Sequence, residues 1–245
     1  MELRPAQRSN VKMRVALHGP SGSGKTYSAL QLAFGISQNQ VIAVIDTENG
    51  SAELYSHLGS FHVLPLSAPF TPEKFMEAIV SCNLFGADVL VIDSLSHAWE
   101  GSGGILEIHG NMPGNSFANW SKVVPRHNQL MQMLLHAPLH VIATLRAKQD
   151  YVMSDRNGKM IPEKIGLKPV QKEGIDYEFT LAFELSMDHK ARASKDRTGM
   201  FVDKEPFRIN KAVGRHIAQW CTQQVTQPAV NVEMNQNHNL NGTHY

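Results

Sequence analysis

Eight residues near the start of the chain have the types and spacing of a phosphate-binding loop. They fit the pattern G-x-x-x-x-G-K-[ST] and are Gly19-Pro20-Ser21-Gly22-Ser23-Gly24-Lys25-Thr26. Glycines let the backbone curl so that successive N–H groups point at phosphate oxygens. The lysine can place a positive charge on the β- and γ-phosphates, and the threonine hydroxyl can bind Mg²⁺. The motif therefore predicts nucleotide chemistry.

The residues on either side of the loop supply the strand and the helix that such a loop needs. Residues 13–18 form a short apolar run, and residues 26–34 are rich in helix-forming side chains. A strand, a glycine-rich loop and a helix in this order turn the positive end of the helix toward a bound anion. The alternative, a chance turn rich in glycine and serine, does not account for both flanks.

Polar residues stand at the ends of three apolar runs, residues 41–46, 88–93 and 139–145. Asp93 is predicted to support Mg²⁺, and its alternative role is to cap a turn. Glu48 is predicted to orient a water for attack on the γ-phosphate, with Asp46 holding the turn; the alternative is a solvated loop acid. Thr144 is in the position of a polar residue that senses the γ-phosphate.

Two basic stretches follow the third run. Residues 146–172 can hold a polyanion, or they form a solvated hairpin that turns at Asn157-Gly158. The seven basic residues of this stretch are Arg146, Lys148, Arg156, Lys159, Lys164, Lys168 and Lys172. The second stretch, residues 189–199, contains Lys195 and Arg197 and can act as a basic finger on the nucleotide of a neighbouring subunit. A solvated loop is the alternative there.

Two other features point to chemistry less directly. Trp99 and Trp120 flank a glycine-rich loop, where stacking on bases competes with core packing, the commoner role of tryptophan. Ser94 and His97 lie near Asp93, but no nucleophile-elbow pattern accompanies them, so a hydrolase triad is not predicted.

Short apolar runs separated by helical stretches predict an α/β fold with a mostly parallel sheet and helices on both faces. One helix is predicted to be capped by Thr71, with Pro72 in its first turn and with Phe75, Met76, Ile79 and Val80 on one face. Another is predicted from about residue 125, where Pro125 starts or kinks it, to residue 136, with Leu130, Met133 and Leu134 facing inward. Residues 178–186 alternate as a half-buried antiparallel strand does, and residues 213–224 predict a final helix.

Length and composition set the limits of these predictions. The 245 residues suit one large domain, divided into an N-terminal arm (1–11), a single domain (12–225) and a disordered tail rich in Asn and Gln (226–245). The formal net charge of +1 neither indicates nor excludes nucleic acid. No apolar run reaches the roughly 18–20 residues of a membrane span, and residues 1–8 lack a signal-peptide core. The predicted location is the cytoplasm, with no membrane partner.

Residues 12–205 resemble the phage-encoded P-loop ATPases with a RecA-like core that act as single-strand annealing proteins or recombinases. The most specific parts of the resemblance are residues 91–101 and Lys195-Asp196-Arg197-Thr198. The resemblance implies a RecA-like P-loop NTPase core with antiparallel C-terminal strands. It also implies ATP and Mg²⁺ as cofactors, assembly of subunits into a ring or filament with the nucleotide between them, and the bacterial host's cytoplasm as the location.

The resemblance assigns roles to particular positions. Lys25 and Thr26 match the phosphate lysine and the Mg²⁺ hydroxyl, Asp93 the second acidic motif, and Glu48 the catalytic glutamate. Thr144 stands where RecA has a glutamine that reports the nucleotide state, so the same switch is not implied. Lys195-Asp196-Arg197 is similar to the Lys-Asn-Arg finger of RadA and hexameric helicases. Residues 99–118 and 147–175 correspond to two DNA-binding loops.

Together these observations predict an ATPase that binds single-stranded DNA and promotes annealing or strand exchange in phage homologous recombination. A single-strand-binding protein is a further partner that the resemblance suggests. One alternative is a nucleotide-gated adaptor or loader that acts on replication proteins without binding DNA. Another is a small-molecule kinase, although the sequence contains no clear arginine-rich lid.

Overall fold

The computed structural model describes residues 11–156 and 159–223. Within these ranges, the side chains of residues 150–156, 159–160, 162–165 and 176 are not described. The predicted tail (226–245), nearly all of the predicted arm (1–11) and the Asn157-Gly158 turn lie outside the described residues.

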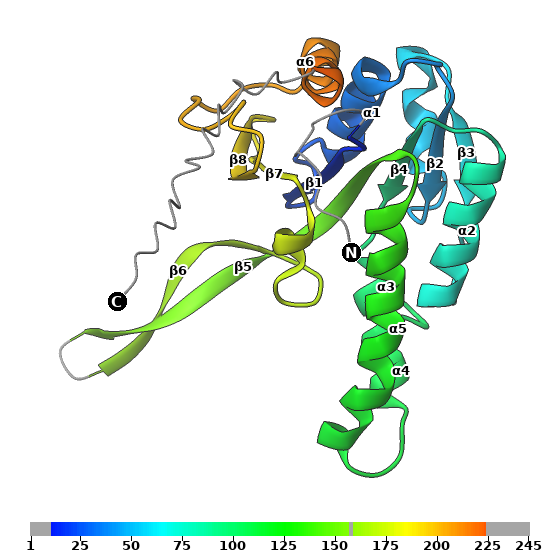
Figure 1. The fold of residues 1–245 in the computed structure, drawn as a ribbon. Coiled ribbons are helices and arrows are strands. Elements are labelled where there is room, and N and C mark those ends of the chain that lie inside the picture. The colour runs from blue at the N-terminus through cyan, green and yellow to red at the C-terminus, as the bar shows by residue number, and fades with distance from the viewer. Residues whose placement is uncertain (1–10, 157–158, 224–245) are drawn as a thin grey trace, which may run out of the picture.

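The centre of the fold is a sheet with the strand order β3-β2-β4-β5-β1-β7-β8 (Figure 1). All neighbouring strands from β3 to β7 are parallel, and β7 and β8 are antiparallel. The prediction of a mostly parallel α/β sheet with antiparallel C-terminal strands is therefore confirmed. The strands are β1 (Arg14–Gly19), β2 (Ile42–Asp46), β3 (His62–Pro65), β4 (Val89–Asp93), β5 (His140–Arg156), β7 (Leu181–Leu185) and β8 (Ala191–Asp196).

The register of the parallel strands brings the predicted site residues to one edge of the sheet. Strand β5 lies between β1 and β4, and Gly19 of β1 is level with Arg146 of β5. Asp46 of β2 is level with Asp93 of β4. Because parallel strands all end at the same edge, the phosphate loop and the acidic residues meet there.

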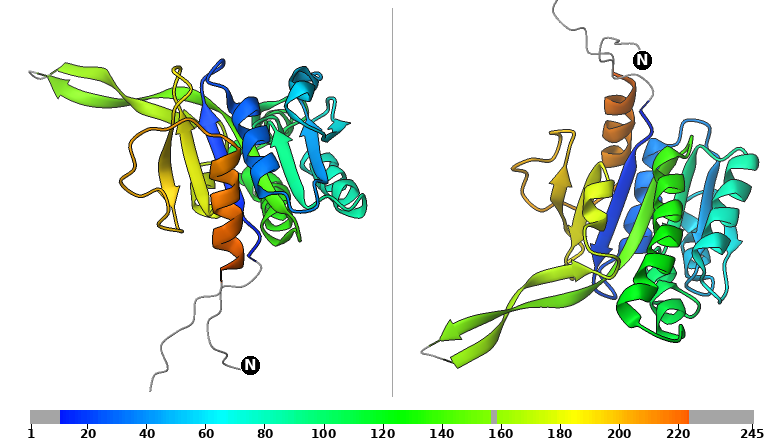
Figure 2. Two further views of the ribbon diagram at one scale, coloured as in Figure 1. Left: turned by 90° about the horizontal axis from the view of Figure 1, so that it is seen from above. Right: turned by 60° about the horizontal axis from the view of Figure 1, so that its bottom comes forward.

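Helices cover both faces of the sheet (Figure 2). On one face α1 (Lys25–Ile36) and α6 (Lys211–Thr222) pack with the 3₁₀ helix η1 (Ser51–Leu58) against strand residues such as Leu17 and Val44. On the other face α2 (Pro72–Leu84) and α5 (Ser116–His136) pack against residues such as Ile45 and Ile92. Burial on two faces explains why these strands read as continuous apolar runs.

The helix after β3 begins where the sequence predicts. Thr71 caps α2 by accepting a hydrogen bond from the backbone N–H of Lys74 at 3.3 Å, and Pro72 is in the first turn. Phe75 and Ile79 are buried as expected. Val80 differs from the prediction because it lies toward solvent, with 45% of its surface exposed.

The prediction for the helix near residue 125 is wrong at its N-terminus. Helix α5 begins at Ser116, where Asn115 caps it, and Pro125 lies inside the helix. The Asn115 side chain accepts hydrogen bonds from the N–H groups of Phe117 and Ala118, so the cap fixes the start of the helix. Leu130 and Leu134 are buried as predicted, and Met131 is more buried than Met133.

Two C-terminal predictions also need correction. Residues 178–186 were expected to form a half-buried antiparallel strand, but only Leu181–Leu185 form β7, which pairs in parallel with β1 and antiparallel with β8. Both faces of β7 are covered, since Ala182 is as buried as Phe183. The final helix runs two residues earlier than expected, because Asn210 caps it.

The two predicted DNA-binding loops are largely regular structure. Residues 99–118 contain the end of α3 (His97–Glu100), all of α4 (Ile105–Gly110) and the start of α5. Beyond the sheet β5 pairs with β6 (Lys159–Pro169) as an antiparallel ribbon that projects from the body (Figure 1). A 3₁₀ helix, η2 (Ile175–Glu178), follows this ribbon. Among the described residues, no helix combines the length and apolar character that crossing a membrane requires.

Candidate functional site

The predicted phosphate loop joins β1 to α1. Gly22 and Gly24 have φ angles of 82° and 85°, a left-handed conformation that favours glycine. The loop is closed by a hydrogen bond from the Ser23 N–H to the Pro20 carbonyl at 3.3 Å. Lys25 is the first residue of α1, and its amine donates to the carbonyls of Gly19 at 3.0 Å and Pro20 at 2.8 Å. The lysine side chain therefore folds back over the phosphate loop, where it is predicted to bind phosphate oxygens.

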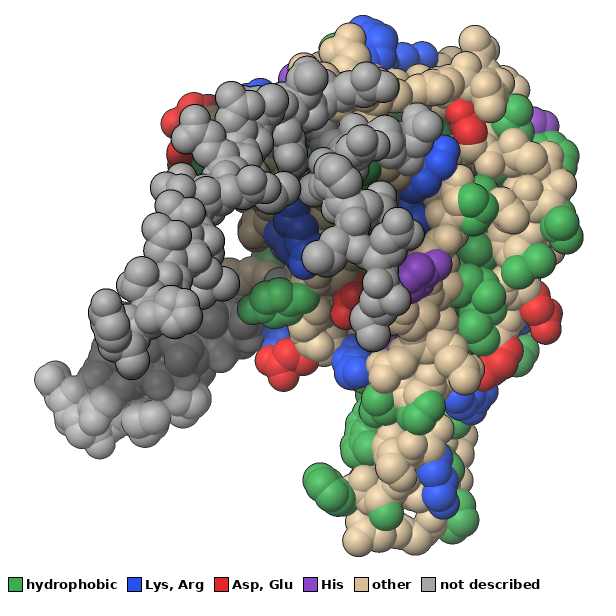
Figure 3. Space-filling model, viewed as in Figure 1, with side chains coloured by type: hydrophobic (Ala, Val, Ile, Leu, Met, Phe, Trp, Pro, Cys, Tyr) green, Lys and Arg blue, Asp and Glu red, His purple; other side chains and the backbone are tan. Residues whose placement is uncertain are grey.

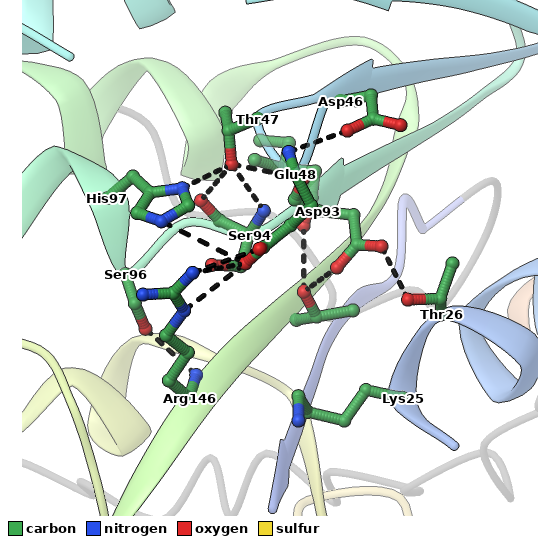
Figure 4. Close-up of polar contacts among 12 residues, drawn as sticks. Lys25, Thr26, Asp46, Thr47, Glu48, Asp93, Ser94, Ser96, His97 and Arg146 are labelled. Carbon is green, nitrogen blue, oxygen red and sulfur yellow. Dashed lines mark hydrogen bonds and ion pairs between the residues drawn. The ribbon is translucent and has the colours of Figure 1, made fainter. Parts of the chain in front are cut away.

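The predicted Mg²⁺ residues lie in contact. The Thr26 hydroxyl donates to Oδ2 of Asp93 at 2.6 Å (Figure 4). Asp93 ends β4 and is 2% exposed. Burial raises the pKa of this carboxyl, while hydrogen bonds from Thr144 and Thr26 act in the opposite direction. A hydroxyl beside a buried carboxylate is a donor set that suits a hard cation.

Thr144 lies behind this pair and does not line the pocket described below. Its side chain is fully buried in β5, and its hydroxyl donates to Oδ1 of Asp93. Any sensing of a γ-phosphate by Thr144, as predicted, would therefore act through Asp93. Thr144 orients Asp93: its hydroxyl binds Oδ1 of the carboxylate, and the hydroxyl of Thr26 binds Oδ2.

Glu48 follows β2 and is held by a cation. Nη2 of Arg146 lies 2.9 Å from both carboxylate oxygens of Glu48, and Nε lies 3.2 Å from Oε1. Asp46 accepts hydrogen bonds from the N–H groups of Glu48 at 2.6 Å and Ala52 at 2.9 Å, so it holds the turn as expected. Arg146, which is predicted as a DNA contact, reaches into the candidate site.

His97 is a second neighbour of Glu48 that sequence reasoning set aside. Its Nε2 lies 3.9 Å from Oε1 of Glu48, and its Nδ1 lies 2.6 Å from the hydroxyl of Thr47 (Figure 4). Burial, followed by the charge of Arg146, lowers the pKa of His97. In the sequence, the spacing of Ser94 and His97 suggests only a hydrolase triad and gives no sign of a contact with Glu48.

A pocket of about 1080 Å³ opens over the phosphate loop. Besides the loop, Glu48 and Asp93, it is lined by residues from α1, η1, the turn after β7 and the segment before α6. Sequence reasoning did not predict these lining residues, which include Tyr27, Tyr55, His189, Arg208 and Asn210. No motif marks them, because they come together only when β7 pairs with β1 and α6 packs against α1.

The residues of the phosphate loop fit a Mg²⁺-bound nucleotide. Ser23 Oγ is buried and has no hydrogen-bond partner among the described residues. The Lys25 amine donates only to carbonyls of its own loop in the contacts above, and burial lowers its pKa, an effect that Asp93 and Glu48 oppose. Lys25 lines the pocket, and an amine there is suited to phosphate oxygens.

The described cations of the predicted DNA segment have partners in the same chain. Arg146 pairs with Glu48, Lys148 with Glu100 at 2.7 Å, and Lys168 with Glu173 at 3.2 Å. Lys172 donates to the side chain of Asn128 at 3.1 Å. The side chains of Arg156, Lys159 and Lys164 lie outside the described residues. On the face in Figure 3, Lys and Arg are interspersed with Asp and Glu.

The two tryptophans stack within the chain. Trp99 and Trp120 have ring centroids 6.1 Å apart, and Trp120 stacks on His109 at 4.0 Å. Both indoles are half-buried. Their faces are therefore largely used in packing α3, α4 and α5 together.

The predicted finger residues lie away from the phosphate loop of their own subunit. Lys195 is near the end of β8, and its amine lies 5.5 Å from the ring centroid of Tyr177. Arg197 donates to the Tyr177 carbonyl at 2.9 Å. Asp196 accepts hydrogen bonds from Thr198, Gly199 and Phe201, which fixes the following turn.

The sequence of residues 11–215 matches the family model of the AAA domain. The chain belongs to the AAA domain family. The match includes every element of the site described above, from β1 to the segment before α6. This AAA domain family is one of P-loop ATPases, which generally use ATP and Mg²⁺. A comparison with curated proteins gives no match.

Proposed function

We propose that this AAA domain binds ATP with Mg²⁺ at residues 19–26 and hydrolyses it. The observation that carries the proposal is the contact between Thr26 and Asp93 beside the Lys25 amine, all at the edge of one pocket. Lys25 would bind phosphate oxygens, and Thr26 with Asp93 would hold the cation. Bound Mg²⁺ would neutralise charge that develops on the phosphates.

Glu48 is the residue we assign to water activation. It lines the pocket beside Lys25, and its carboxylate is held by Arg146 and approached by His97. A carboxylate with a fixed orientation can accept a proton from an attacking water. Arg146 also offsets the negative charge of Glu48 in the pocket that Glu48 shares with Asp93.

Nucleotide binding is tested first with Lys25→Ala, compared with Lys122→Ala on the exposed surface of α5. Titration calorimetry with ATP and Mg²⁺ should show binding for the wild type and Lys122→Ala, and a loss of at least about 100-fold for Lys25→Ala, because the lysine is the main phosphate cation. Equal affinities for the two variants would contradict the assignment of the site.

We further propose that the domain binds single-stranded DNA and promotes annealing or strand exchange in phage recombination. Two points support this step: the resemblance of residues 91–101 and 195–198, and the continuity of β5. That strand runs from Thr144 and Arg146 beside the pocket directly into the β5–β6 ribbon. A polyanion on the ribbon would therefore act on β5, the strand whose Arg146 binds the carboxylate of Glu48. A single-strand-binding protein would be a natural further partner.

A specific observation favours a second candidate, an adaptor that does not bind DNA. Arg146, Lys148 and Lys168 are each paired with an acid of the same chain, which leaves less free positive charge for phosphates. If the protein is such an adaptor, the bound nucleotide would control how the β5–β6 ribbon contacts a replication protein.

One experiment separates the two candidates. Binding of a labelled single-stranded oligonucleotide is measured with ATP, with ADP and without nucleotide, at two salt concentrations. Salt-sensitive binding that requires ATP would support the DNA-binding ATPase. ATP hydrolysis without oligonucleotide binding in any state would support the adaptor instead.

A further inference from the structure

The turn between β7 and β8, residues 186–190, covers the phosphate loop. Strands β1 and β7 are parallel neighbours that end at the same edge, with His18 level with Glu184. The loop after β1 and the turn after β7 therefore leave the sheet side by side. A Cβ placed on Gly24 would lie 3.3 Å from Nδ1 of His189, and one placed on Gly22 would lie 3.6 Å from Cε of Met187.

The turn is held by its own residues, and in the described part of the chain these contacts do not involve the imidazole of His189. The N–H of His189 donates to the Ser186 carbonyl at 3.0 Å, and the N–H of Ser186 donates to the Lys190 carbonyl at 3.0 Å. Lys190 and Asp188 form an ion pair at 3.5 Å. His189 has a left-handed φ of 62°. Among the described residues, none forms a hydrogen bond or an ion pair with its ring.

We propose that His189 is a phosphate ligand of this nucleotide site, supplied by the β7–β8 turn in addition to the phosphate loop. The inference rests on the nucleotide binding proposed above. The imidazole lies over Gly24, at the start of the helix whose N–H groups face the bound anion, and it lines the same pocket as Lys25. A protonated imidazole there would donate a charge-assisted hydrogen bond to a phosphate oxygen.

The surrounding charges set the direction of the expected pH dependence. Lys25 and Arg208 line the pocket near the loop and the turn, and Asp188 and Lys190 flank His189. Glu48, Asp93, Glu100, Arg146 and Lys148 line the rest of the pocket. Imidazoles in general gain a proton near pH 6.5, so a contact that depends on a charged imidazole is compared on both sides of that pH. Such a contribution should be larger at about pH 6 than at about pH 8.

The test compares the wild type with His189→Asn, because Asn also tolerates a left-handed backbone but carries no charge. His189→Gly provides a second variant that suits the same backbone. The matched control is His136→Asn, an exposed histidine near the end of α5. Dissociation constants for ATP and for tripolyphosphate, each with Mg²⁺, are measured at about pH 6 and about pH 8. The ratio of variant to wild type at each pH cancels the protonation of the phosphates themselves.

The expected ratio is about fivefold to tenfold at about pH 6 for both ligands, the size of one partly exposed charge-assisted hydrogen bond, and it falls toward one at about pH 8. Normal wild-type binding with a ratio of one at both pH values would overturn the role of His189 and leave the proposed function standing. A change for ATP but not for tripolyphosphate would place the ring on the nucleoside and overturn the phosphate assignment. A wild type that binds neither ligand would overturn both proposals.

Discussion

Glu48 shows how much a single residue in this site depends on its neighbours. The carboxylate is fixed by two hydrogen bonds from Nη2 of Arg146, and the imidazole of His97 lies 3.9 Å away. The backbone of Glu48 is fixed separately, through the carboxylate of Asp46. Orientation of this kind is what water activation needs, because a general base acts only within hydrogen-bond reach of the proton it removes.

Replacing Glu48 by Gln should separate ATP binding from hydrolysis. The amide keeps the size of the side chain but cannot accept a proton, so kcat for ATP should fall by about 100-fold or more. The Kd for ATP, measured by titration calorimetry, should change by less than about threefold, because Lys25 and Thr26 remain. Glu53→Gln, an exposed acid in η1, is the control and should keep wild-type kcat. A variant that loses binding and turnover equally would argue against the role of Glu48 as a base.

A different residue, His140, should control stability in mild acid. It is buried at the start of β5, where its Nδ1 accepts a hydrogen bond from the Met13 N–H at 3.1 Å. Burial lowers its pKa to about 4, helped by the charges of Lys12 and Arg14. An unfolded chain protonates histidine near pH 6.5. The contribution of His140 to stability is therefore fully present above that pH and is lost as the pH falls toward 4.

Between pH 7 and pH 5 this single group should cost about 2 kcal/mol of unfolding free energy. Urea unfolding at the two pH values measures the loss. His140→Asn, which retains an acceptor but does not titrate, should reduce it by about that amount. His136→Asn, an exposed neighbour, should behave as the wild type does. The same pH dependence in wild type and His140→Asn would rule out His140 as the cause.

At the scale of elements, the close packing of α1 against α6 fixes one wall of the pocket. Gly35 of α1 and Gly214 of α6 face each other: a Cβ on Gly35 would lie 2.3 Å from the Lys211 carbonyl oxygen and 2.6 Å from Cα of Gly214. Backbone atoms cannot move aside as a flexible side chain can. Because Arg208 and Asn210 lead into α6 and line the pocket, the packing of α6 also positions them.

Gly35→Ala should therefore destabilise the domain by about 1–3 kcal/mol, the usual cost of overpacking, and should also weaken ATP binding as α6 shifts. Gly110→Ala is the matched control, since a Cβ there meets nothing within 4 Å. It should leave stability unchanged or raise it by up to about 1 kcal/mol. Denaturant midpoints and ATP titrations on both variants provide the check. Equal midpoints would show that the two helices can separate without cost.

Elements also decide what the sequence could predict. The phosphate loop, the parallel strands and the cap at Thr71 were predictable because local residues determine them: glycines for a left-handed turn, apolar runs for buried strands, a hydroxyl and a proline for a helix start. The start of α5 was missed because a proline is typical of a first turn, which pointed to Pro125, whereas Asn115 caps the helix. Strand β7 was misjudged because Ala and Thr at alternate positions look exposed, although Ala182 is covered by the second helical layer.

The residues of the site also fall into those that local sequence predicts and those that only strand pairing brings into place. Lys25, Thr26, Asp93 and Glu48 come directly from motifs and strand ends. Arg146 was predicted for another role, because its partner Glu48 is 98 positions away and only the register of β2, β4 and β5 brings them together. His189 had no local signal at all. Its position over Gly24 depends on the pairing of β1 with β7.

For the whole molecule, the arrangement of β8 separates the phosphate loop from the predicted finger. Asp196 pairs with Leu181, which is level with Val15 near the start of β1, whereas the phosphate loop follows the end of β1. Four residues of strand separate these levels, about 13 Å at about 3.3 Å per residue. Lys195 and Arg197 are thus poorly placed to serve their own nucleotide, so the predicted finger role requires a neighbouring subunit.

If Arg197 acts on a neighbouring subunit, mixing two inactive variants should restore ATP hydrolysis. In Lys25→Ala the phosphate loop is damaged and Arg197 is intact, and in Arg197→Ala the reverse holds. A mixed ring or filament would contain some interfaces with an intact loop from one subunit and an intact finger from the other. Each variant alone should hydrolyse ATP at least about 100-fold more slowly than wild type, in line with the loss of a transition-state cation.

An equal mixture should regain roughly a quarter of the wild-type rate, because about one random interface in four joins an intact loop to an intact finger. The measurement is a steady-state ATPase assay on the mixture across protein concentrations, since interfaces form only when subunits associate. Arg192→Ala, a change on the same strand, serves as the control and should remain active alone. A mixture that stays as slow as its two components, while both variants assemble normally, would place Arg197 outside the catalytic interface and leave each nucleotide site to the residues of a single chain.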